Sequence, residues 1–301
     1  MLTKADKYLI DDIHNILENG FWDEDPRPRY EDGTPAHTIS VNHVTRKYDL
    51  SKGEFPVCTL RPQAWKTGVR EIFTIYQKPT NVIAEMCEQG VTWWGPWDIG
   101  DGTIGQRYGA TVKRYDLMNG LIKDIRENPY GRRKIVSLWQ ETDLRETPGL
   151  PPCAFLTIWN VRGTYLDMVL VQRSGDMLTA SGAGGINEIQ YAALLLMIAR
   201  VTGKEPGVFT HFVANEQIYD RHIDNANEML RRAAEVEAAD GAEAVEAATA
   251  NDTDAAADNA ALPRLVLHKE PGCDFTDITL ADFEMVNYAP IKPQLKFDLG
   301  I

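Results

Sequence analysis

The stretch from Leu150 to Asp176 constrains the fold most, because its residue pattern predicts a β-hairpin. Residues 154–160 alternate large apolar side chains with others, which is the two-residue period of a strand. A turn is expected at Arg162-Gly163, and residues 165–174 are apolar enough to predict a second strand buried on both faces. Because the two strands of a hairpin run antiparallel, Cys153 and Arg173 are predicted to lie close together.

This predicted pair suggests a chemical role for the hairpin. A thiol beside a fixed cation has a lowered pKa, because the positive charge stabilises the thiolate. Cys153 also follows two prolines, which stiffen the backbone before it, so we regard it as a candidate nucleophile. The alternative is a small buried apolar residue, which is the commoner role of a single cysteine near a strand.

Other motifs accompany the hairpin in a fixed order along nearly the whole chain. They are residues 32–38 (DGTPAHT), 131–139 (GRRKIVSLW), Cys153 after Pro152, 172–176 (QRSGD), Asn187 with 190–192 (QYA), and 218–223 (IYDRHI). This set resembles the thymidylate synthase family, and residues 32–38 are similar to a variant opening found in a subset of its bacterial members. Several motifs in order are more specific than any one of them.

The resemblance implies an α+β fold in which one large domain, residues 1–301, holds a mixed β-sheet flanked by helices. It also implies a homodimer in which the sheets of two subunits pack back to back. At 301 residues the chain has the length of one large domain or two small ones. Residues 236–261 are rich in Ala, Asp and Glu with almost no large apolar side chain, so we interpret them as a surface insertion that extends the preceding helix.

Apolar periodicity predicts the remaining elements. Helices are expected at residues 3–18, 69–77, 115–127, 188–201 and 216–235, and strands at 37–44, 55–60, 206–214, 265–267 and 283–288. Thr3 and Gly20 are suited to cap the first of these helices. The helix at residues 188–201 is apolar nearly all round, which predicts that it is buried in the core.

Composition and charge argue against several classes of protein. No apolar run approaches the roughly 18 residues that span a bilayer, and residues 1–12 lack the pattern of a secretory signal. The four cysteines form no CxxC pair and no Cys/His cluster, which argues against a zinc site and a disulfide scaffold. The net charge of −13 argues against general nucleic-acid binding. We expect a cytoplasmic protein without metal, membrane or nucleic-acid partners.

The reaction implied by the resemblance is the reductive methylation of deoxyuridylate (dUMP) to thymidylate (dTMP). The one-carbon donor and reductant would be 5,10-methylenetetrahydrofolate, which leaves as dihydrofolate. Cys153 would add to C6 of the uracil, Arg173 would stabilise the thiolate, and Glu71 and Tyr108 would move protons. Asn187 would recognise the pyrimidine, because an amide donates and accepts at once. The alternatives are a solvent-facing helix acid for Glu71 and a helix N-cap for Asn187.

The resemblance also assigns the groups that hold the nucleotide. Phosphate and ribose would be bound by Arg27, Arg173, Gln172, Ser174, Gln217 and Tyr219. Gln217 departs from the histidine that the family usually has at this position. For Arg27 the second choice is Arg29, and a solvated loop arginine is the alternative for both. Arg132 and Arg133 are adjacent at a predicted strand start, where neighbouring side chains point to opposite faces, so the pair cannot easily serve one local site by itself. The resemblance implies that they reach across a two-fold interface to the partner's phosphate, and two surface arginines are the alternative.

The folate would lie against Arg61, Trp94, Asp176 and the C-terminal Ile301, which in the family closes over the ligand. The chain departs from the family pattern at Gly95-Pro96, where two acids are usual, at Ala154, where histidine is common, and in a slightly longer loop at residues 177–186. These departures leave two other functions open. One is a deoxypyrimidine-nucleotide hydroxymethylase, which would use water in place of hydride in the last step. The other is a catalytically silent nucleotide-binding paralogue.

Overall fold

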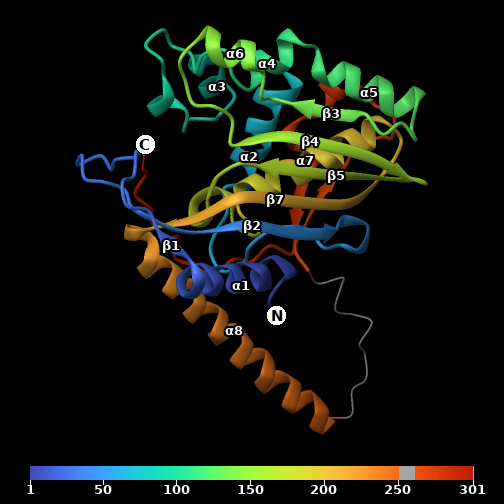
Figure 1. The fold of residues 1–301 in the computed structure, drawn as a ribbon. Helices are drawn as coiled ribbons and strands as arrows, with labels where there is room; N and C mark the ends of the chain where they lie inside the picture. The colour runs from blue at the N-terminus through green and yellow to red at the C-terminus, as the bar shows by residue number, and fades with distance from the viewer. Residues whose placement is uncertain (251–261, 301) are drawn as a thin grey trace.

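The computed structural model describes residues 1–250 and 262–300 and is built around a seven-stranded sheet (Figure 1). Along the sheet the strand order is β1-β2-β7-β5-β4-β3, and β6 pairs with β7. The bounds are β1 Phe21–Trp22, β2 Thr38–Asp49, β3 Lys134–Ser137, β4 Ala154–Arg162, β5 Tyr165–Gln172, β6 Gly175–Asp176 and β7 Glu205–Tyr219. The β5–β7 and β6–β7 pairs are parallel and the others antiparallel, so the predicted mixed sheet is confirmed.

Strands β4 and β5 form the predicted hairpin. Their register runs from Ala154 opposite Gln172 to Arg162 opposite Tyr165, and Gly163 in the turn has a φ of +64°. The prediction that the second strand is buried on both faces is wrong, because its residues alternate between buried and half-buried. The buried face packs in the core with helix α7, and the other face belongs to the side of the sheet that faces the viewer in Figure 1.

Helices α2 and α7 lie behind the sheet in Figure 1 and cover one of its faces. The helices are α1 Lys4–Asn19, α2 Trp65–Ile72, α3 Ile83–Glu88, α4 Gly109–Arg114, α5 Leu117–Glu127, α6 Glu141–Glu146, α7 Ile186–Val201 and α8 Ile223–Ala250. Thr3 caps α1 as predicted, since its side chain accepts a hydrogen bond of 3.0 Å from the backbone N–H of Asp6. Helix α7 is buried along most of its length, which confirms the predicted core helix.

Two predicted elements differ in the structure. Residues 55–60 form no strand; Phe55, Val57 and Leu60 bury their side chains in the core while the backbone follows an irregular path. Residues 216–219 belong to β7 instead of the following helix, because the β2–β7 ladder continues to the pair Thr38–Tyr219. Apolar spacing was ambiguous in both segments. No described strand pairs with residues 55–60, whereas pairing with β2 extends β7 through Tyr219.

The C-terminal part of the chain adds a second, two-stranded sheet of β8 (Arg264–Leu267) and β9 (Phe283–Val286), as the pattern predicted. Helix α8 continues through residues 236–250 and runs away from the body of the molecule in Figure 1. The rest of the predicted insertion, residues 251–261, lies outside the described residues. In the described ranges 1–250 and 262–300, no helix is both long and apolar enough to cross a lipid bilayer.

Candidate active site

A cavity of about 1130 Å³ opens where the ends of β5, β6 and β7 meet α2 and the start of α7. It is lined by many of the predicted site residues: Arg27, Arg61, Glu71, Trp94, Tyr108, Cys153, Gln172, Arg173, Ser174, Asp176, Asn187, Gln217 and Tyr219. These side chains come from nine separate segments of the chain, so the fold brings together what the sequence predicted only as separate motifs. A cavity of this size exceeds the range of roughly 300–1,000 Å³ that is typical for one ligand.

Cys153 and Arg173 lie at the predicted end of the hairpin. The Nη2 atom of Arg173 is 3.4 Å from the Sγ atom of Cys153. The same guanidinium donates to the carbonyls of Pro151 at 2.8 Å and Pro152 at 3.0 Å. The backbone N–H of Arg173 also donates to the carbonyl of Cys153 at 2.9 Å. The two prolines therefore orient the arginine toward the thiol as well as stiffening the chain before it.

The predicted lowering of the cysteine pKa is contradicted. Burial raises the pKa of the Cys153 thiol above its ordinary value, and the charge of Arg173 offsets only part of that increase. Burial of the sulfur raises the pKa more than the single positive charge of Arg173 lowers it, and that guanidinium also donates hydrogen bonds to two carbonyls. In this pocket the thiol form is favoured at neutral pH.

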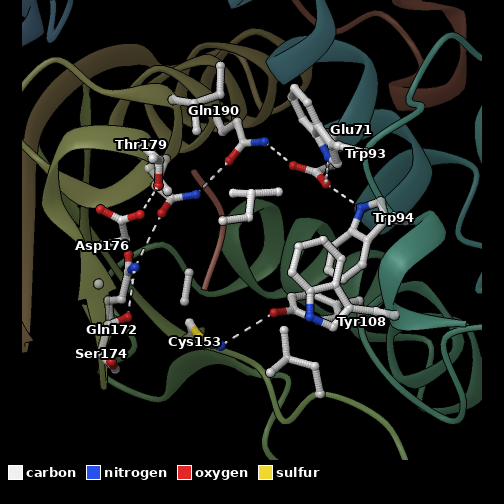
Figure 2. Close-up of a pocket in the computed structure, with 18 of the residues that line it drawn as sticks. Glu71, Trp93, Trp94, Tyr108, Cys153, Gln172, Ser174, Asp176, Thr179 and Gln190 are labelled. Atoms are coloured by element: carbon white, nitrogen blue, oxygen red, sulfur yellow. Dashed lines mark hydrogen bonds between the residues drawn. The ribbon is translucent and has the colours of Figure 1, made fainter. Parts of the chain in front are cut away.

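Glu71 is buried at the inner wall of the cavity, with 7% of its surface exposed. Its Oε1 atom accepts hydrogen bonds from the indole N–H groups of Trp93, at 2.6 Å, and of Trp94. Its Oε2 atom accepts one from the side-chain amide of Gln190 (Figure 2). Burial raises the pKa of Glu71 and these three donors lower it in part. The alternative of a solvent-facing helix acid is therefore excluded.

A chain of side-chain amides connects Glu71 to the strand ends. Gln172 Nε2 donates to Asn187 Oδ1 at 3.2 Å, and Asn187 Nδ2 donates to Gln190 Oε1 at 3.0 Å. Gln190 then donates to Glu71. Asn187 lies within the first turn of α7, whose N-cap is Gly185, so the N-cap alternative for Asn187 is wrong. The amide of Asn187 lines the cavity with one further N–H and one further lone pair to offer.

Tyr108 occupies a strained position beside the cysteine. Its φ of +47° is unusual for a residue with a side chain and places it just before α4. The Tyr108 hydroxyl oxygen accepts a hydrogen bond of 3.3 Å from the backbone N–H of Cys153. Its ring makes an edge contact with Trp94, with 5.0 Å between the ring centroids. Burial raises the pKa of Tyr108 well above its ordinary value, so the phenol keeps its proton.

The cavity wall around Ser174 and Gln217 is polar. Ser174 Oγ donates to Gln217 Oε1 at 3.4 Å, and Tyr219 and Arg27 line the same wall. Arg29 is absent from the lining and its backbone instead bridges to Pro35, so of the two candidate arginines Arg27 is the one at the cavity.

Arg132 and Arg133 are exposed on the loop before β3 and do not line this cavity. Strand β3 begins at Lys134, so neither arginine is part of the predicted strand in the described chain.

Tryptophans and the C-terminal segment also line the cavity. Trp93, Trp94 and Trp97 line it, and Arg61 donates to the carbonyl of Leu178 while its guanidinium lies 5.0 Å from the centre of the Phe297 ring. A Cβ atom on Gly300 would lie 2.7 Å from the Tyr219 ring, so the chain end passes close over that ring. The predicted Ile301 lies outside the described residues.

Asp176 has one carboxylate oxygen that accepts no hydrogen bond within the described part of the chain. Its Oδ2 atom accepts a hydrogen bond from Thr179 (Figure 2), whereas its Oδ1 atom is buried without a hydrogen-bond partner among the described residues and lies 3.8 Å from Nδ1 of His222. A buried acceptor of this kind is costly unless a ligand donates to it.

The contacts that Gln190, Trp93 and Thr179 make with the predicted site residues were not among the predictions from the sequence. Gln190 lies three residues after Asn187, and this spacing puts both side chains on one face of α7. That spacing was the available signal for Gln190. No pattern identified Trp93 or Thr179, because their contacts with Glu71 and Asp176 depend on loop conformation. Over the described ranges, no three His, Cys, Asp or Glu side chains gather to form a metal site.

Comparison with known proteins agrees with this geometry. The sequence model of the family described as thymidylate synthase matches residues 7–301. The chain is similar to the thymidylate synthase of Lactococcus lactis subsp. lactis, with 45% identity over 306 aligned positions that cover 100% of both chains. It is 43% identical to that of Streptococcus pneumoniae over the full length of both. Among solved structures, thermostable thymidylate synthase A from Bacillus subtilis aligns with a TM-score of 0.82 and 30% identity, covering 99% of this chain and 100% of that one. The chain therefore belongs to the thymidylate synthase family.

Proposed function

We propose that this protein converts dUMP to dTMP by reductive methylation with 5,10-methylenetetrahydrofolate, releasing dihydrofolate. The observation that carries the proposal is the convergence of Cys153, Asn187 and Glu71 on one cavity, where hydrogen-bonded amides connect Asn187 to Glu71. A nucleophile, a base-reading amide and a buried carboxyl group are the groups that this reaction needs. The names of the full-length relatives support the same activity.

The nucleotide end of the cavity fits dUMP. The guanidinium groups of Arg173 and Arg27, with the hydroxyl of Ser174, suit a phosphate. Asn187 can donate from Nδ2 to O4 of uracil and accept at Oδ1 from N3–H, while keeping its bonds to Gln190 and Gln172. In our proposal Tyr219 and Gln217 contact the ribose.

The rest of the cavity lining fits a folate. The Oδ1 atom of Asp176, which accepts no hydrogen bond from the described residues, can accept from a donor on a pterin ring. The indole groups of Trp93, Trp94 and Trp97 offer flat apolar surfaces to the same ligand, and Arg61 adds a cation to the lining. When bound, the folate supplies the one-carbon unit and the hydride. We propose that Ile301, which follows Gly300 at the cavity rim, contributes to closing it.

The chain's own groups provide the covalent and proton-transfer steps. In our proposal the Cys153 thiolate bonds to C6 of uracil, which makes C5 electron-rich, and the developing charge on O4 is met by the N–H of Asn187. Glu71 takes up and returns protons, since burial moves its pKa toward neutrality. Arg173 partners the sulfur when it is ionised. The protonated hydroxyl of Tyr108 donates beside the cysteine.

A covalent trapping experiment tests this function. The inhibitor 5-fluoro-dUMP presents fluorine where the reaction must remove a proton, so with methylenetetrahydrofolate it should remain attached to Cys153. Mass spectrometry of the digested protein should find the adduct on Cys153 in the wild type and in Cys87→Ser, and no adduct in Cys153→Ser. An absence of adduct in the wild type would favour the silent paralogue. Turnover that forms hydroxymethylated nucleotide without dihydrofolate would favour the hydroxymethylase.

We propose that the protein works as a homodimer in which residues 1–301 of each chain form one catalytic domain. The uncovered face of the sheet carries a cross-strand row of Ile135, Ile158 and Val169, and 53% of the surface of Ile135 is exposed. An apolar row of this kind on a sheet face is typical of a protein–protein interface. Arg132 and Arg133 adjoin this row, which fits a role at the partner's phosphate site.

The free thiols of Cys153 and the other cysteines suit the reducing cytoplasm.

A further inference from the structure

A buried cluster of charged side chains lies behind the cavity wall. Arg46, with 1% of its surface exposed, donates to Glu188 at 2.8 Å, to Glu216 at 2.9 Å and to Asp12 at 2.6 Å. Its Nη2 atom also donates to the carbonyl of Ser181 at 2.6 Å. Burying three carboxylates around one guanidinium adds little to stability compared with an apolar core. The cluster contacts no substrate in the proposed reaction, so any effect on that reaction must pass through neighbouring side chains.

His211 joins this cluster to the active site. The ring is fully buried on β7, and its Nδ1 atom lies 3.0 Å from Glu188 Oε1 and 3.3 Å from Arg46 Nη2. On the other side of the ring, Nε2 lies 3.1 Å from Oε1 of Gln172, at the end of the neighbouring strand β5. Gln172 is the first amide of the chain that leads through Asn187 and Gln190 to Glu71.

The partners of Gln172 determine which way its amide points. Gln172 Nε2 lies 3.1 Å from the carbonyl oxygen of Ser174, which can only accept, so the NH₂ group faces Ser174 and Asn187. The carbonyl oxygen of Gln172 therefore faces His211, and the ring nitrogen next to it must carry a proton. This conclusion holds for both charge states of the ring. In a neutral ring Nδ1 can accept from Arg46, and in a charged ring Nδ1 can donate to Glu188.

The orientation of Gln172 in turn determines what Asn187 presents to a pyrimidine. Because Gln172 donates, the Oδ1 atom of Asn187 faces Gln172 and its Nδ2 atom faces Gln190. In this orientation Oδ1 can accept from N3–H of uracil and Nδ2 can donate to O4. An inverted Asn187 would present the pattern that matches N3 and the 4-amino group of cytosine. The cost of inversion is the loss of directed hydrogen bonds along the amide chain.

We propose that His211, held by the Arg46 cluster, is a positioning residue for uracil specificity: its donated hydrogen bond to Gln172 keeps Asn187 in the uracil-reading orientation. The inference rests on the proposed base-reading role of Asn187. It adds four buried residues, Arg46, Glu188, Glu216 and His211, to the groups that determine which nucleotide is bound.

The test compares dUMP and dCMP affinities by calorimetry in the wild type, His211→Phe, His211→Gln and His211→Asn. The amide of glutamine reaches the position of the imidazole Nε2 and can still donate to Gln172, whereas that of asparagine reaches only the position of Nδ1. In His211→Phe and in His211→Asn the ratio of dUMP affinity to dCMP affinity should fall about tenfold, because one hydrogen bond is lost. His211→Gln should stay close to the wild-type ratio. If His211→Phe does not fold, the Asn and Gln variants decide.

Tyr48→Phe is the matched control. It removes the 2.7 Å hydrogen bond from Tyr48 to Glu188 Oε2 within the same cluster but touches no amide of the chain. It should lower the melting temperature and leave the dUMP-to-dCMP ratio unchanged. Wild-type ratios in both His211→Asn and His211→Phe would overturn the inference. A wild-type protein that does not prefer dUMP would instead remove the assignment of Asn187 in the proposed function.

Discussion

At the residue scale, the position of the Cys153 thiol and its acidity have different origins. Hairpin register predicted that Cys153 and Arg173 meet, and they do, at 3.4 Å. The direction of the pKa shift depended instead on how much of the pocket wall surrounds the sulfur, and burial raised the thiol pKa. Because the thiolate is the reactive form, a raised pKa lowers the reactivity of this cysteine at neutral pH.

Alkylation of the free enzyme should report this pKa. The labelling rate of Cys153 by iodoacetamide should be low at neutral pH and increase as the pH rises through the raised thiol pKa, because only the thiolate reacts. In Arg173→Met the loss of the cation should move the midpoint of this curve to higher pH by about one unit. Site-resolved mass spectrometry measures the rates, with the exposed Cys87 as an internal reference. A midpoint that falls or stays constant in Arg173→Met would contradict the account.

At the scale of elements, close contact between α2 and α7 sets the position of Glu71. A Cβ atom on Gly68 of α2 would lie 2.7 Å from Ile186 Cδ1 and 3.2 Å from Gln190 Cγ. The two helices therefore meet at a residue without a side chain, and this contact brings Gln190 within hydrogen-bonding range of Glu71. Sequence periodicity predicted both helices but could not predict which of their residues touch.

Gly68→Ala should separate the two helices and move Gln190 away from Glu71. We expect unfolding free energy to decrease by about 1–3 kcal/mol, as for other overpacked cores, and kcat to fall because Glu71 loses a donor. Chemical denaturation and steady-state kinetics measure both effects.

Gly120→Ala in α5 is the control, since no heavy atom lies within 4 Å of the added methyl group. It should stabilise the protein by about 0.5–1 kcal/mol through helix propensity. Equal behaviour of the two variants would disprove the close-contact explanation.

At the scale of the whole molecule, the sheet has one face covered by α2 and α7 and one face that is half-exposed and apolar (Figure 1). The cavity opens along the strand ends, while Arg132 and Arg133 lie on the loop before β3 and outside its lining. In our proposal a single chain supplies the nucleophile and the base-reading amide, and the two exposed arginines serve a second chain.

Mixing inactive subunits tests this arrangement. Cys153→Ser and the double variant Arg132→Ala/Arg133→Ala should each have little activity alone. After denaturation and refolding together in equal amounts, heterodimers should carry one intact site, and about one quarter of wild-type activity should return for random pairing. A mixture of Cys153→Ser with Glu71→Gln is the control, because both residues line the same cavity of one chain and no site is restored. Recovery in neither mixture would refute the shared site.

The order of the motifs along the sequence was enough to predict the family, and 13 of the 16 predicted site residues line the cavity. The family match confirms the predicted thymidylate synthase identity, and the hairpin, the core helix and the mixed sheet agree with the pattern that predicted them. These features are encoded locally, in the order of short motifs and in the spacing of apolar side chains along each element. Residues 55–60 and 216–219 were assigned wrongly, because local spacing does not tell which distant segment a strand pairs with.

Only the tertiary structure decided the environment of each group. Glu71 meets Gln190 across 119 positions of the chain, and Arg46 meets Glu216 across 170. The burial of a group, the orientation of an amide and the direction of a pKa shift all depend on many such contacts. The pKa of a buried group is set by its desolvation together with all the charges and hydrogen bonds around it. The motifs therefore identify the chemical groups, whereas the fold determines their protonation and the direction in which each one faces.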